Sequence, residues 1–193
     1  QASALVRRHS AATLDLVTGL QSMSFWKPMA HRDLRSSFRF KHPVSLTTIG
    51  LLRPESVPDQ GWDPVLEAVG RLVRLSIRST DLAMRESDAQ ITVLLPHTDS
   101  EGARRFGELI TSRIADLEIQ TQTGMIQIGA VASSVTLDPA TIPTTWSRAP
   151  VPFGYFERTE TLLRERAASL LGTAARQGAE TSLLHPGTEW PED

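Results

Sequence analysis

The sequence contains no cysteine among its 193 residues, and this absence excludes two classes of site. Disulfide bonds and thiolate metal sites both require cysteine sulfur, so the chain has neither. A chain without disulfides agrees with a reducing compartment, and we expect it to act in the cytoplasm. The five histidines show no metal-ligand spacing, so we expect no metal ion and no cofactor.

Lysine is nearly as scarce, because Lys27 and Lys41 are the only two and every other basic residue is arginine. The formal net charge is -2, so no overall positive field favours nucleic acid or an acidic membrane surface. No stretch approaches the roughly 18 consecutive apolar residues of a membrane-spanning helix. We therefore expect neither a nucleic-acid partner nor membrane contact.

The length and the 40% hydrophobic content predict one globular domain with short flanking segments. We place a linker or signalling helix at residues 1–14, the domain at 15–180, and an edge strand with a polar tail at 181–193. The chain starts at Gln1 instead of Met, so we expect it to be a piece of a longer protein.

Hydrophobic periodicity and turn residues predict an alternation of helices and strands along the domain. Asp63 is expected to cap a helix whose first position is Pro64. The expected helices are 24–37, 64–78, 100–116 and 159–177, and the expected strands are 44–52, 81–86, 89–96 and 124–135. This order predicts an α/β (α+β) fold with a central mixed sheet of about five strands, flanked by helices.

Several strings in this order resemble the GGDEF family of diguanylate cyclases. They are LDLVTGL (14–20), GWDPVLEAVGRLVR (61–74), RSTDLAMRESDAQITVLLP (78–96), MIQIGAVA (125–132) and LLRERAASLLGTAARQG (162–178). The resemblance covers about residues 14–180 and implies the nucleotide-cyclase-like GGDEF fold. It also implies where substrate, metal and product would bind.

The residues that the resemblance assigns to catalysis are replaced in this chain. Ser-Asp-Ala-Gln-Ile at 87–91 stands where Gly-Gly-Asp/Glu-Glu-Phe is expected, and Gly50 stands at a metal-binding aspartate. Magnesium requires oxygen ligands, which Gly50 and Ala89 do not provide. The phosphate-binding lysine of the last helix is Ala175. We therefore expect a degenerate domain with no catalytic residues, one that is not an enzyme.

The product-binding motif of the family, Arg-x-x-Asp, is present as Arg78 and Asp81. The resemblance implies that this inhibitory site (I-site) binds cyclic di-GMP. An arginine fork donates two parallel hydrogen bonds to guanine or phosphate, and a carboxylate accepts from guanine N–H groups. The same spacing recurs at Arg85/Asp88 and Arg113/Asp116, so only the surrounding strings select the first pair. A surface salt bridge is the structural alternative.

The resemblance also implies a second arginine from a neighbouring helix, and the following helix offers Arg104, Arg105 and Arg113. On a helical wheel, Arg104 and Arg105 fall away from the apolar stripe, whereas Arg113 lies at its margin. We therefore choose Arg113. Arg74, one turn before Arg78, is expected to join the same basic patch.

The sequence predicts a non-catalytic cyclic di-GMP receptor that regulates a partner protein or an attached domain. A ligand-mediated dimer is one arrangement of such a receptor. The alternative is a nucleotide-free interaction or dimerisation module with a relic motif. Its docking surface would be the Pro-rich loop 137–158, where Trp146, Phe153, Tyr155 and Phe156 are expected to be exposed. Residual enzymatic activity is the reading that the sequence favours least.

Overall fold

The structure is a computed structural model that describes residues 13–55, 57, 61–122, 124–143, 150–176 and 183–191. Residues 1–12 of the expected linker helix 1–14, Trp146 and the expected helix stop at Gly178 lie outside these residues. The elements are α2 (Met23–Phe40), β1 (Val44–Leu52), α3 (Asp63–Ser76), β2 (Leu82–Ser87), β3 (Gln90–Pro96), α4 (Ser100–Ala115), β4 (Ile119–Thr121), β5 (Gly124–Ile126), β6 (Gly129–Leu137), the 3-10 helix η2 (Pro139–Thr141), α5 (Tyr155–Arg176) and β7 (Leu183–Thr188).

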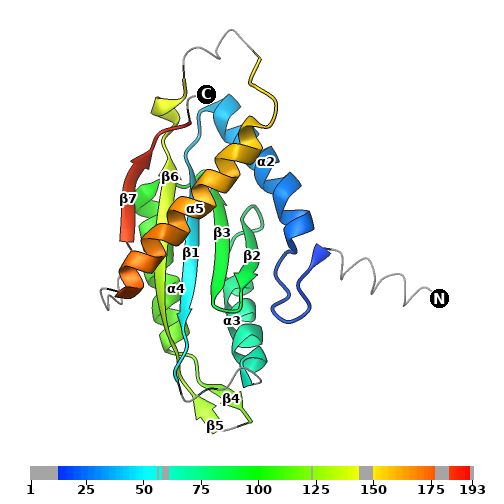
Figure 1. Cartoon of the computed structure of the whole chain (residues 1–193), viewed down its shortest axis with the longest axis vertical. Helices are drawn as coiled ribbons and strands as arrows, with labels where there is room; N and C mark the ends of the chain where they lie inside the picture. Colours follow the sequence, from blue (N-terminus) through cyan, green and yellow to red (C-terminus); the bar gives the residue numbers. More distant parts are fainter. Residues whose placement is uncertain are drawn as a thin grey trace, which may run out of the picture.

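Five strands form one mixed sheet in the order β2-β3-β1-β6-β7 (Figure 1). Neighbouring strands are antiparallel, except that β7 runs parallel to β6. The sequence prediction of a mixed sheet of about five strands flanked by helices is confirmed. The short strands β4 and β5 pair with each other as a separate hairpin at one end of the molecule (Figure 1).

Helices cover both faces of the sheet. Side chains alternate along β1, so Leu46 enters the core shared with α2 and α5, whereas Ile49 enters the core shared with α3 and α4. All of residues 44–51 are buried as a result. The continuous apolar run that predicted a buried strand therefore has its explanation in a sheet covered on both sides.

A buried charge network joins three elements on the α2–α5 face. The indole N–H of Trp26 donates to Oε1 of Glu160 over 2.8 Å, and Nε of Arg164 donates to the same oxygen over 2.7 Å. Arg164 also donates to Glu86 at the end of β2, over 2.6 Å. Glu160 is only 1% exposed, so the charge of Arg164 compensates a carboxylate that would otherwise be costly to bury.

Helix α3 begins one residue earlier than predicted, at Asp63 instead of Pro64. Asp63 is the first helical residue instead of the cap, and Trp62 occupies the cap position without a capping side-chain hydrogen bond. The first helical turn tolerates Pro64 because its N–H groups lack partners within the helix. An aspartate in that turn still interacts favourably with the positive end of the helix.

The expected strand 124–135 is two strands. β5 ends at Ile126, and β6 begins at Gly129. The sequence did not predict β4, which is only three residues long and pairs with β5. A continuous β-type pattern cannot distinguish one long strand from two strands that bend away from each other, because the side-chain period is the same.

The expected loop 137–158 ends earlier than predicted, because α5 begins at Tyr155. Tyr155 and Phe156 were expected to be exposed, but they are 2% and 7% exposed. Both rings make edge-to-face contacts with Phe38, and so does Trp190, which is buried although it lies in the expected polar tail. Because of these aromatic contacts, α5 begins at Tyr155 and its first turn packs against Phe38 of α2. Phe153 is fully exposed, as predicted.

The loop at residues 15–20 is held closed by its own residues. Oδ1 of Asp15 accepts hydrogen bonds from the backbone N–H and the hydroxyl of Thr18, over 2.8 and 2.7 Å. Gly19 has a positive φ of 65°, which glycine adopts without strain. Gly70 of α3 packs against this loop, so that a Cβ there would lie 2.4 Å from the carbonyl oxygen of Thr18.

The loop also covers the outer edge of the sheet. Gln21 forms a parallel bridge with Met84 of β2, and its backbone N–H donates to the carbonyl of Ala83 over 2.9 Å. Its side-chain oxygen accepts from the N–H of Ala83 over 2.6 Å. The β2 edge therefore has partners for some of its backbone groups.

We expect Gly70→Ala to destabilise the domain by about 1–3 kcal/mol, because the added methyl group overlaps backbone atoms that cannot move freely. In an unstrained helix the same change stabilises by roughly 0.5–1 kcal/mol. Urea unfolding of the variant and the wild type measures the difference. An increase in stability would show that the loop does not pack tightly on α3.

Candidate functional site

The junction between α3 and β2 contains Arg78 and Asp81. Oδ2 of Asp81 accepts a hydrogen bond from the backbone N–H of Arg78 over 2.8 Å, and the N–H of Asp81 donates back to the Arg78 carbonyl over 3.1 Å. Asp81 is only 6% exposed. The Arg-x-x-Asp spacing therefore has a local structural role, because it closes the turn that leads into β2.

A hollow of about 270 Å³ lies between this turn and α4. The residues lining it are Ser76, Arg78, Asp81, Leu95, Thr98, Gly102, Arg105, Phe106 and Leu109. Helix α4 contributes residues three to four positions apart, which share one face of a helix. The hollow thus combines an apolar floor with one carboxylate and two guanidinium groups.

Two arginines stand at the hollow with few competing partners. Among the described residues, the Arg78 side chain makes neither a hydrogen bond nor a salt bridge, and it is exposed. The guanidinium of Arg105 lies 3.6 Å from Glu101, with both side chains largely exposed. Such a surface pair contributes about 0–1 kcal/mol, so it holds Arg105 only weakly.

The other predicted arginines have different surroundings. Arg113 donates to the hydroxyl of Ser76 over 3.1 Å, at the margin of the hollow, but it does not line it. Arg74 donates to the carbonyl of Thr18, so it ties α3 to the 15–20 loop. Arg104 is engaged by Glu101 and Glu108, each at 2.6 Å.

Arg105 is the residue that sequence reasoning passed over. On the helical wheel Arg105 lies off the core stripe, so the wheel does not select it. The hollow lies beside the core stripe of α4. A side chain of α4 that reaches the hollow therefore stands next to that stripe and not on it. The spacing of Gly102, Arg105 and Leu109 was the available signal, because these residues form a second stripe next to the apolar one.

Burial raises the pKa of the Asp81 carboxyl above its ordinary value of 3.8, although the hydrogen bond from the Arg78 backbone and the charge of Arg78 oppose this effect. Burial also acts on Asp15, which contacts Arg85 of β2, but the hydrogen bonds from Thr18 and the charge of Arg85 outweigh it. The pKa of Asp15 is therefore lowered.

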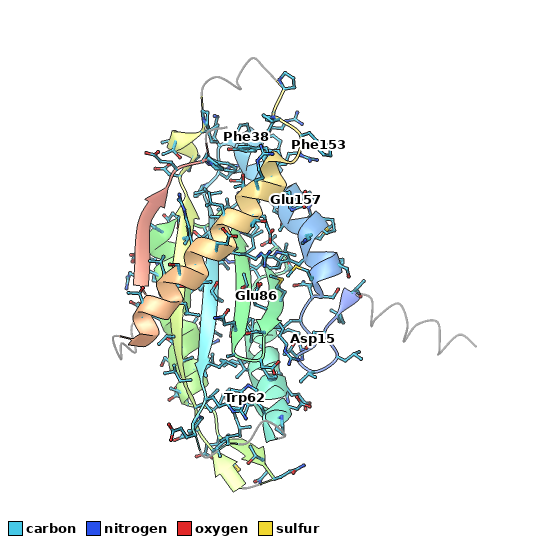
Figure 2. All side chains as sticks on the ribbon, in the orientation of Figure 1. Asp15, Phe38, Trp62, Glu86, Phe153 and Glu157 are labelled. Carbon is cyan, nitrogen blue, oxygen red and sulfur yellow. The ribbon has the colours of Figure 1, made fainter. Side chains whose placement is uncertain are left out.

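The β2–β3 turn lies elsewhere, near the hairpin end of the molecule. Its Asp88 accepts a hydrogen bond from Arg85 over 2.5 Å, and its backbone carbonyl accepts one from the indole N–H of Trp62 over 2.6 Å. Trp62 is buried beneath the turn (Figure 2). The turn is thus fixed by one ion pair and one buried indole.

Gly50 lies on β1 directly beside this turn, paired with Gln90. A Cβ at position 50 would lie 2.9 Å from a terminal carbon of Leu171 on α5. The apolar side chain of Leu171 therefore fills the space beside Gly50 on the α5 side of the sheet. Among the described residues, no group of three or more histidine, aspartate or glutamate side chains is placed to hold a metal ion.

We expect Asp81→Asn to keep the turn, because the amide oxygen can still accept from the Arg78 N–H. The pKa of Asp81 is higher in the folded chain than in the unfolded chain, so the folded state binds the proton more tightly. The Asp81 carboxyl therefore contributes most to the free energy of unfolding at a pH below 3.8. This contribution is lost as the pH rises through the raised pKa of the folded state. Urea unfolding across this range should show the variant gaining stability relative to the wild type, and a pH-independent difference would contradict the assignment.

Comparisons with known proteins agree with this architecture. The family model described as "Diguanylate cyclase, GGDEF domain" matches residues 12–142. No match was found among curated proteins. Among the described residues, no helix is both long and apolar enough to span a membrane.

Solved structures with the same fold share little sequence with this chain. The GGDEF domain of FimX from Pseudomonas aeruginosa is 17% identical, with a TM-score of 0.71 over 90% of this chain and 99% of that chain. The GGDEF domain of DgcB from Caulobacter crescentus, solved in complex with c-di-GMP, is 14% identical, with a TM-score of 0.71 over 90% and 93%. Diguanylate cyclase SiaD from Pseudomonas aeruginosa, in complex with its activator SiaC, is 20% identical, with a TM-score of 0.72 over 95% and 66%.

The family match spans more than half of the sequence, and the fold as a whole is similar to that of these solved domains. The chain therefore belongs to the GGDEF domain family.

Proposed function

We propose that this chain is a non-catalytic receptor for cyclic di-GMP that binds its ligand at the hollow beside Arg78 and Asp81. The observation that carries the proposal is the pair of guanidinium groups, Arg78 and Arg105, on either side of a hollow with a buried carboxylate. The DgcB domain, which has the same fold, was solved in complex with c-di-GMP. Such a receptor would act in the cytoplasm.

The chemistry of the hollow suits a guanine base with its phosphate. An arginine fork donates to guanine O6 and N7, and a carboxylate accepts from the N1 and N2 hydrogens. Phe106 and Leu109 offer apolar contact to the face of the base. Arg105 has donors available for the phosphate, because its contact with Glu101 is weak.

The size of the hollow limits how much ligand it encloses. Its volume of about 270 Å³ lies below the roughly 300 Å³ at which pockets for whole drug-sized ligands begin. One base with its phosphate would enter, and the rest of the dinucleotide would lie across the surface. A second chain could then bind the exposed half, which is the basis for a ligand-mediated dimer.

The positions that the family uses for metal do not fit a divalent cation here. Gly50 and Ala89 carry no oxygen side chain, and Gln90 is neutral. Leu171 closes the space beside Gly50, so the site is apolar where a hard cation needs oxygen ligands. We therefore propose that the chain does not synthesise cyclic di-GMP, and that its output is regulation of a partner protein or an attached domain.

We expect isothermal titration of the wild type with cyclic di-GMP to show low-micromolar or tighter binding. Arg78→Ala should weaken it by roughly 5- to 150-fold, because a bidentate contact to guanine is worth about 1–3 kcal/mol. Arg105→Ala should weaken it by a smaller factor. Arg104→Ala is the matched control. The Arg104 guanidinium pairs with Glu101 and Glu108 and does not line the hollow, so this variant should leave the affinity unchanged.

The same titration separates the remaining alternatives. Arg113→Ala and Arg74→Ala test the two arginines that the sequence analysis selected, and a loss of affinity for either would restore that residue to the site. No heat from the wild type, or binding that is indifferent to Arg78→Ala, would favour the nucleotide-free interaction module. Binding of GTP with similar affinity would exclude a product-specific site.

We expect no cyclic di-GMP to form when the purified chain is incubated with GTP and Mg²⁺, because Gly50, Ala89 and Gln90 do not provide the carboxylates that would hold the metal. Chromatography of the mixture against a cyclic di-GMP standard measures this. An active GGDEF domain assayed in parallel is the control. Product formed by this chain would overturn the non-catalytic assignment while leaving the ligand site untouched.

A further inference from the structure

A second hollow, of about 770 Å³, lies between the C-terminal half of α2 and the first turn of α5. It belongs to the α2–α5 layer, on the opposite face of the sheet from Arg78 and Asp81. Its volume falls within the roughly 300–1,000 Å³ of ligand-binding clefts. Figure 2 shows Phe38, Phe153 and Glu157 together at this end of the molecule.

The charges around this hollow are unbalanced. Arg35, Arg39 and Lys41 line it, and Glu157 is the one carboxylate in the lining. Among the described residues, none of the three cations forms a hydrogen bond or salt bridge with a carboxylate, and all three are exposed. His31 at the same hollow has a buried Nε2 with no hydrogen-bond partner among those residues. This concentration of cations favours an anionic occupant.

Each of these three cations lies over an aromatic ring, and for Arg39 it is the neighbouring Phe40, whose ring centre is 5.3 Å from the guanidinium carbon. The guanidinium carbon of Arg35 lies 5.3 Å from the centre of the Phe156 ring, and the ammonium of Lys41 lies 6.0 Å from that of Phe38. A cation stacked on a ring face keeps its N–H groups available at its edge. The cations are therefore positioned in advance for an oxygen anion, with less rotamer entropy to lose on binding.

The opposite wall of the hollow is apolar. Val151, Pro152 and Phe153 line it, and the Phe153 ring is fully exposed. An exposed aromatic ring beside arginines is typical of the centre of a protein interface, where aromatic and arginine side chains are enriched. A small ligand in the hollow would leave most of the outer face of Phe153 in water.

We propose that this hollow binds an acidic peptide segment of a partner protein, in which carboxylates alternate with apolar or aromatic side chains. The carboxylates would bind Arg35 and Arg39, which lie one turn apart on α2. The apolar side chains would cover Phe153. The cations are spread along the helix, whereas a phosphate site converges its donors on one point. A mononucleotide is therefore the weaker fit.

A random dodecapeptide library displayed on phage tests this proposal, selected in parallel on three forms of the chain. These are the wild type, the double variant Arg35→Glu/Arg39→Glu, and the control Lys27→Glu/Arg32→Glu, whose residues lie on α2 outside the lining. We expect a consensus with acidic and aromatic residues from the wild type and the control, and not from the double variant. The consensus peptide should then bind the double variant at least about tenfold more weakly.

Further titrations keep the outcome decisive if the charge reversals disturb folding. Phe153→Ser changes a fully exposed side chain, so the core is retained, and it should also weaken binding of the consensus peptide. The proposal is overturned if no acidic consensus emerges, or if binding is indifferent to both Arg35→Glu/Arg39→Glu and Phe153→Ser. It is also overturned if GTP or ATP binds through these arginines and the peptides do not.

The two proposed sites are distinguished by one more measurement. Cyclic di-GMP titrated into Phe153→Ser should bind as it does to the wild type, because the residues on the α3–α4 face are unchanged. Peptide binding that survives Arg78→Ala would establish the docking site even if the chain binds no dinucleotide. Failure of the peptide selection would leave the dinucleotide result unaffected.

Discussion

The central strand β1 is buried on both faces, and the rest of the architecture depends on this constraint. A strand with apolar side chains on both faces is stable only between two layers, so α3 with α4 must cover one face and α2 with α5 the other. Each layer then has its own core and its own surface depression. The buried Glu160, which Arg164 links to β2, fixes α5 against α2 and the sheet. The helices that line the two candidate hollows are thus packed against the sheet.

The sequence predicted the order of the principal elements because each carries a strong periodic signal. It failed where tertiary contacts override that signal. Tyr155 and Phe156 read as loop residues, yet they become the first turn of a helix because Phe38 and Trp190 provide aromatic partners from distant parts of the chain. The break between β5 and β6 was equally invisible, because the pattern of alternation continues across it.

Some residues of the candidate site could also be predicted from the sequence, whereas others depend on tertiary packing. Arg78 and Asp81 could be located from the sequence, since their spacing closes a local turn and the flanking strings set the register. Arg105 has only a weaker signal in the sequence, its spacing with Gly102 and Leu109, because its place at the hollow depends on how α4 packs beside that turn. The helical wheel selected Arg113 for its proximity to the core, whereas the structure places Arg113 against Ser76 and Arg105 in the hollow. A motif within one short segment can be predicted from the sequence, but the packing distance between two separate elements cannot.

The bridge between Gln21 and Met84 bears on how copies of this domain behave toward one another. β2 is the outermost strand on its side, and an uncovered outermost strand readily adds a strand from a neighbouring molecule. The loop at 15–20 brings Gln21 onto that strand and occupies part of its backbone. This loop and Gln21 therefore also limit self-association through the β2 edge. A chain trimmed beyond Gln21 would expose this strand and become prone to aggregation.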